Sequence, residues 1–155
     1  MRPLARILLL FWVGMLLQAC SGTDVSPEDE IRAFIDSAVE AAEARNSSDL
    51  ANMIHGAYQD QKGYNKKQLS SLLRAYFFRH KNIHLLARIG DIELLGDNRA
   101  QVRMHVAMAG SLIADIDALS ALRAQIYAFD MTLVKQDEWL VQHASWRPAS
   151  IADLQ

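Results

Sequence analysis

The spacing of apolar residues changes once along this chain, near Ile83, and this change limits the folds open to it. Before Ile83, apolar residues recur every three or four positions, as they do on one side of a helix. After Ile83, apolar and polar residues alternate, as they do on a strand with one buried face. Helices followed by strands predict an α+β domain with its helices on one face of the sheet.

Capping residues mark where the predicted helices begin. Ser26 precedes Pro27 and two acidic residues, a pattern typical of a helix start. Asn65 is followed three residues later by Gln68, which predicts a capping box. We therefore expect three helices, over residues 26–45, 48–54 and 65–78, with Ser48 as the cap of the second and a loop over residues 56–63.

Alternating segments predict four strands after the helices, over residues 83–95, 99–109, 125–135 and 139–147. The apolar phase of the first strand slips near Gly90, which predicts a β-bulge that bends the strand. Two short turns and a longer connection over residues 110–120 join the strands into an antiparallel meander. Hydrophobicity predicts that Met104 and Phe129 point inward, toward the helices.

Aromatic residues occupy particular places in this order of elements. They are found in Tyr58-Gln59-Asp60 after the second helix, Tyr76-Phe77-Phe78 at the end of the third, Tyr127-Ala128-Phe129-Asp130 in the third strand, and Asp137-Glu138-Trp139-Leu140-Val141 with Trp146 around the last. In this pattern, residues 26–148 resemble the nuclear transport factor 2-like (SnoaL-like) family, and the cystatin-like arrangement is its nearest competitor. The resemblance implies a cone, in which N-terminal helices pack on a curved, four-stranded, mainly antiparallel sheet with a pocket at its open end.

The first twenty residues have the features of an export signal. Arg2 and Arg6 precede an apolar run over residues 7–17, which is shorter than the roughly 20 residues that a membrane span needs. Leu17-Gln18-Ala19-Cys20 then resembles the lipobox of bacterial lipoproteins, with Gln18 an unusual residue at its position. The resemblance implies cleavage before Cys20 and lipidation of that residue. An ordinary secretory cleavage nearby, leaving Cys20 as a free thiol, is the alternative.

Lipidation would determine where the domain lies. The expected organisation is a signal peptide over residues 1–19, a tether over 20–25, the domain over 26–150 and a tail over 151–155. Several acyl chains on Cys20 would anchor the protein to a membrane. Ser21 stands where an inner-membrane retention signal has Asp, and it therefore favours the outer membrane, facing the periplasm. Cleavage removes two of the 16 Lys and Arg residues and leaves 18 Asp and Glu, a formal charge of −4.

Three residues are candidates for acid–base chemistry. The resemblance puts Tyr58 and Asp60 near the mouth of the cone, where an Asp can act as a base and a Tyr can donate to a developing oxyanion. His84 is a further candidate base. The structural alternative is that Tyr58 fills the cone and Asp60 caps the turn before Gly63. His80 and His84 are four residues apart, but they fall where helix gives way to strand, so neither a metal site nor a cofactor is expected.

The two faces of the predicted sheet differ in chemistry. Inward positions suit either a plain core or a pocket for an apolar ligand. These candidates are Tyr76, Phe77, Met104, Met108, Phe129, Met131 and Trp146. The opposite face carries Arg103, His105, Asp130, Thr132, His143 and Ser145. That face suits solvent or, as the resemblance implies, an interface between two copies of the chain.

Composition narrows the expected function. The charge balance is slightly acidic and no stripe of Lys and Arg is evident, which argues against nucleic-acid binding. We expect a membrane-anchored lipoprotein whose domain binds a small apolar ligand or a partner protein without catalysis. One alternative is a small isomerase or lyase that uses Tyr58, Asp60 and His84. Another is a structural component of the cell envelope, with a cone filled by its own side chains.

Overall fold

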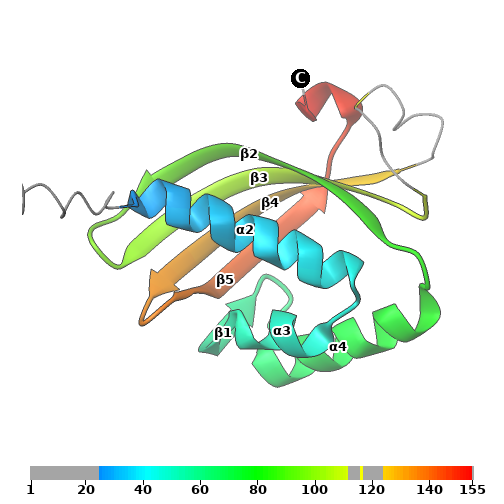
Figure 1. Cartoon of the computed structure of the whole chain (residues 1–155), viewed down its shortest axis with the longest axis horizontal. Coiled ribbons are helices and arrows are strands. Elements are labelled where there is room, and N and C mark those ends of the chain that lie inside the picture. The colour runs from blue at the N-terminus through cyan, green and yellow to red at the C-terminus, as the bar shows by residue number, and fades with distance from the viewer. Residues whose placement is uncertain (1–24, 112–115, 117–123, 155) are drawn as a thin grey trace, which may run out of the picture.

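A computed structural model describes residues 25–111, 116 and 124–154 (Figure 1). The export signal and Cys20 lie outside these residues, as does most of the connection predicted over 110–120. The elements are α2 (Pro27–Glu43), α3 (Ser47–Asn52), β1 (Ile54–Asp60), α4 (Lys66–Arg79), β2 (His84–Leu94), β3 (Arg99–Ala109), β4 (Gln125–Lys135), β5 (Trp139–Pro148) and the 3₁₀ helix η2 (Ile151–Leu154). None of the helices that the structure describes is long and apolar enough to cross a membrane.

The caps of α2 and α4 confirm the helix starts predicted from the sequence. The Ser26 side chain accepts a hydrogen bond from the backbone of Asp29, with Pro27 in the first turn. Asn65 and Gln68 form the predicted capping box at the start of α4. The cap predicted for the second helix was wrong, because Asn46 rather than Ser48 accepts the bond from the backbone of Asp49.

The sheet contains the predicted antiparallel meander and one additional strand. Its strand order is β1-β5-β4-β3-β2, and β2 to β5 pair antiparallel. The β2–β3 register shifts between Ile89 and Asp91, which confirms the bulge predicted at Gly90. The curved sheet and the helices that cover it form the predicted α+β cone (Figure 1).

The fifth strand corrects the prediction of a loop over residues 56–63. Strand β1 pairs parallel to β5, with Ile54 opposite Val141 and Asp60 opposite Ala144. This segment contains His, Gly, Ala, Gln and Asp, which are not strong strand formers. Its strand conformation therefore depends on pairing with β5, which lies more than 80 residues away along the chain.

The core lies between α2 and the inner face of the sheet. Helix α2 crosses that face (Figure 1), and its Ile31 and Ile35 pack among buried residues that include Val102 and Met104 of β3 and Leu133 of β4. These contacts confirm the inward direction predicted for Met104. A smaller cluster on the other face joins Ala107 and Ile126 to Ile151 of η2.

Candidate functional site

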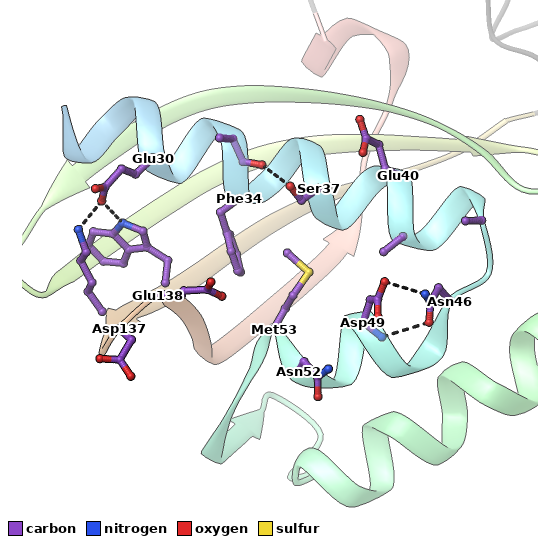
Figure 2. Close-up of a pocket in the computed structure, with 15 residues that line it drawn as sticks. Glu30, Phe34, Ser37, Glu40, Asn46, Asp49, Asn52, Met53, Asp137 and Glu138 are labelled. Carbon is purple, nitrogen blue, oxygen red and sulfur yellow. Dashed lines mark hydrogen bonds and ion pairs between the residues drawn. The ribbon is translucent and has the colours of Figure 1, made fainter. Parts of the chain in front are cut away.

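A groove with a volume of about 800 Å³ lies on the helical side of the molecule. Its walls come from α2, from α3 and from the turn between β4 and β5, and we call it the helix-side groove. Figure 2 shows Phe34 and Met53 extending between α2 and α3, where they form an apolar floor together with nearby alanines. The groove therefore joins parts of the chain that are about a hundred residues apart.

Three side chains close one end of the helix-side groove. Glu30 Oε2 accepts hydrogen bonds from Lys135 Nζ at 2.5 Å and from Trp139 Nε1 at 3.0 Å (Figure 2). The bond from Lys135, followed by that from Trp139, holds the pKa of the Glu30 carboxyl below its usual value. Lys135 Nζ also lies 5.8 Å from the centre of the Trp139 ring. The contacts join the first turns of α2 to the β4–β5 hairpin, so side chains of the protein alone hold this end of the groove in place.

Carboxylates dominate the rim of the groove. Five acidic residues line it, Glu30, Glu40, Asp49, Asp137 and Glu138, against the single cation Lys135. Glu30 is already paired, and Figure 2 shows Glu40 directed away from Met53. Within the described residues, the other three carboxylates form no ion pair, although Asp49 bonds to Asn46. The rim thus retains net negative charge beside an apolar floor.

No pattern in the sequence predicts this groove. Glu30 reads as one of several acids that favour the start of a helix, and Asp137 and Glu138 read as turn residues. Phe34 reads as part of the buried stripe of α2. Only the packing of α3 beside α2, with the hairpin at their end, places these residues around one hollow.

Tyr58 and Asp60 lie together on β1, and each is only 4% exposed. Asp60 Oδ1 accepts hydrogen bonds from the backbone N–H groups of Lys62, at 2.8 Å, and Tyr64, at 3.0 Å. Asp60 Oδ2 is buried and has no hydrogen-bond partner. Burial, followed by the nearby charge of Asp60, raises the pKa of the Tyr58 hydroxyl, so this group stays protonated as a donor. Asp60 therefore holds a turn with one oxygen and leaves the other unpartnered.

The two histidines lie apart from this pair. His84 begins β2, and β1 and β2 are opposite edges of the sheet. Strands β5, β4 and β3 lie between these two edges. His80 ends α4, is exposed, and stacks on Tyr76 with ring centres 4.1 Å apart. No group of three His, Cys, Asp or Glu side chains among the described residues is arranged to hold a metal ion.

The apolar candidates lie on the inner side of the cone and contact one another. Phe129 and Trp146 are opposite each other on β4 and β5, with ring centres 6.1 Å apart. The Tyr76 hydroxyl lies 2.8 Å from Met108 Sδ, and burial raises the pKa of that hydroxyl. Phe77 is buried beside Tyr76, Met104 packs in the main core, and Met131 lies between two clusters. Their role as a ligand pocket stays a prediction.

Polar contacts cover the outer face of the sheet. Arg103 pairs with Asp91 at 2.5 Å, and Gln101 bonds to both Asp130 and Thr132. A shallow hollow of about 350 Å³ lies here, lined in part by Arg103, His105, Asp130 and Ser145. The predicted pairing of two copies through this face stays a prediction.

Comparison with solved structures identifies the fold. A scytalone dehydratase-like protein from Novosphingobium aromaticivorans superposes with a TM-score of 0.65 at 14% identity, over 78% of this chain and 83% of that chain. A nuclear transport factor 2-like protein of unknown function from Shewanella oneidensis gives 0.59 at 16% identity, over 78% and 98%. A ketosteroid isomerase-like protein from Erwinia carotovora gives 0.57 at 12% identity, over 77% and 94%.

These likenesses define the class of fold. The chain has the nuclear transport factor 2-like cone fold, as its order of elements and its aromatic residues predict. No protein-family model matches the sequence, and no curated protein matches it. Because a fold of this kind serves catalytic and non-catalytic proteins alike, the function has to be argued from its sites.

Proposed function

We propose that this chain is a lipoprotein anchored through Cys20, whose domain faces the periplasm and binds a partner protein without catalysis. The lipobox-like Leu17-Gln18-Ala19-Cys20 and the short tether over residues 20–25 support the anchor. The helix-side groove supports the binding role. Its occupant is a basic, amphipathic segment of the partner.

The combination of an apolar floor and an acidic rim carries this proposal. Phe34 and Met53 offer apolar contact between α2 and α3, while Asp137 and Glu138 stand at the rim with no cation paired to them among the described residues. Amphipathic helices bind grooves of this type by their apolar face, with charges at the rim steering the encounter. A small apolar ligand fits the groove less well, because such ligands favour pockets with few charged groups.

A designed peptide tests the groove. A short amphipathic peptide of Leu and Lys should bind the chain, and a peptide of Leu and Glu with the same pattern should not. Asp137→Lys should weaken binding of the Leu and Lys peptide about five-fold, the effect of roughly 1 kcal/mol. Glu93→Lys, which makes the same charge change on the outer face of edge strand β2, is the matched control. Equal effects of the two substitutions would show that net charge, not the groove, governs binding.

A second candidate function rests on the buried pair of Tyr58 and Asp60. An unpartnered carboxylate oxygen beside a protonated phenol is an arrangement that can move a proton within an apolar site. This favours an acid–base enzyme of the isomerase or lyase type, with Asp60 as base and Tyr58 as donor. His84, on the opposite edge of the sheet, is a less suitable partner for that pair. Turnover that survives in Asp60→Asn would exclude this function.

A further inference from the structure

Positive charge is concentrated in one stretch of the chain, contrary to the even distribution that the overall composition suggests. Residues 61–90 contain seven Lys or Arg and no Asp or Glu, whereas residues 26–60 contain eight Asp or Glu and two Arg. Helix α4 lies within the basic stretch and has no acidic side chain. The domain therefore presents a cationic helix although the whole chain has a negative formal charge.

The cations of α4 lie on its outward side together with an aromatic ring. One side of the helix carries four residues spaced four, three and four positions apart, namely Lys67, Ser71, Arg74 and Phe78. All four are exposed, and Phe78 is 89% exposed. The exposed Lys81 follows just beyond the end of the helix. We call this surface the α4 face.

The α4 face is not occupied by the rest of the domain. The buried side of α4 carries Ser70 and Phe77, and Figure 1 shows α3 between α4 and α2. The ion pairs among described residues are Arg103–Asp91 and Lys135–Glu30, so the cations of the α4 face have no acidic partner there. Arg74 donates a hydrogen bond of 3.1 Å to Ser71 within the same face.

We propose that the α4 face docks on a bilayer that contains anionic phospholipids. Lys67, Arg74 and Lys81 would lie against the phosphate groups, and the Phe78 ring would enter the boundary between headgroups and acyl chains. A helix side that combines Lys or Arg with an exposed aromatic ring binds such surfaces through charge and apolar burial together. A soluble polyanion would attract the cations but would leave the Phe78 ring in water. The proposal goes beyond the groove, which lies on other residues and has the opposite charge.

Tryptophan fluorescence in vesicles tests this docking. The full chain carrying Phe78→Trp is reconstituted into vesicles of phosphatidylcholine alone or mixed with phosphatidylglycerol, in both cases with brominated acyl chains that quench tryptophan. Leu95→Trp is the matched control, because Leu95 is 48% exposed and directly follows Leu94, the last residue of β2. The unsubstituted chain gives the background of its own tryptophans.

The proposal predicts one pattern of quenching. The tryptophan introduced at position 78 should be quenched in anionic vesicles and much less in neutral ones, and high salt should reverse the quenching. Adding Arg74→Glu should lower the docked population about five-fold or more, since each cation near an anionic surface contributes about that factor. The tryptophan introduced at position 95 should remain unquenched in both.

Three results would overturn the proposal. The first is equal quenching at positions 78 and 95 in anionic vesicles. The second is quenching at position 78 that does not depend on phosphatidylglycerol. The third is a blue shift at position 78 in neutral vesicles that grows with protein density, because it would place the ring against another copy of the chain. Since both variants share the same N-terminus, none of these readouts depends on how Cys20 is modified.

Discussion

Substitution of Asp60 separates the structural task of this carboxyl group from any chemical one. Oδ1 accepts two backbone hydrogen bonds, from Lys62 and Tyr64, and Oδ2 is buried without a partner. Asp60→Ala removes both bonds from the turn that leads from β1 to α4. Asp60→Asn keeps an acceptor in the place of Oδ1 and removes the charge. The two substitutions should therefore differ in their effect on stability.

The expected magnitudes follow from these contacts. A hydrogen bond to a charged group contributes roughly 1.5–3 kcal/mol. The backbone N–H of Lys62 lies near the surface and can bond to water when Asp60 is absent, so part of the loss is recovered. Asp60→Ala should therefore lower the free energy of unfolding by about 2–4 kcal/mol. In Asp60→Asn the two bonds weaken, but a neutral amide N–H₂ group replaces the unpaired charged oxygen, and burying it costs about 1–3 kcal/mol, less than burying the charge. Its free energy of unfolding should stay within about 1 kcal/mol of the parent.

Urea-induced unfolding at pH 7, followed by circular dichroism, measures this difference. With a slope near 1.5 kcal/mol per M, Asp60→Ala should move the midpoint down by about 2 M and Asp60→Asn by well under 1 M. Asp97→Asn, in the exposed β2–β3 turn, is the control and should change stability by less than about 0.5 kcal/mol. If Asp60→Asn proves as destabilising as Asp60→Ala, Oδ2 has a partner in the folded protein and the reasoning is refuted.

Three further predictions address the anchor, the buried phenol and the core. Cys20→Ser should release the protein from the membrane fraction, and continued association would show that another anchor operates. The raised pKa of Tyr58 keeps its hydroxyl protonated in the folded state, whereas the unfolded chain loses this proton above about pH 10. The free energy of unfolding should therefore be unaffected by this group below about pH 10 and fall by about 1.4 kcal/mol per pH unit above it. Tyr58→Phe should flatten this alkaline slope, and Tyr64→Phe should not if Tyr58 is responsible. Leu133→Ala, at a fully buried position, should lower the free energy of unfolding by about 2–5 kcal/mol in a urea titration, and a loss below 1 kcal/mol would contradict the packing described around α2.

The candidate site shows where sequence reasoning succeeds and where it stops. Tyr58 and Asp60 are two residues apart on one strand, so a local pattern brings them to notice together. Their burial and the unpartnered oxygen of Asp60 arise from packing against α4 and β5, which no pattern in the neighbouring sequence indicates. Residue type alone suggests His84 as their partner, but the strand order places it on the other edge of the sheet.

Local interactions determined much of this molecule from the sequence. The caps at Ser26 and Asn65 and the alternation in β3 and β4 act between residues a few positions apart, so they can be read directly. The bulge at Gly90 also follows from a local slip of phase. The tertiary structure alone decided that β1 is a strand and that α2, α3 and the β4–β5 turn enclose an acidic groove. The physical reason is that β1 and the groove each depend on partners 80 residues or more away, and no local pattern encodes which distant segments will meet.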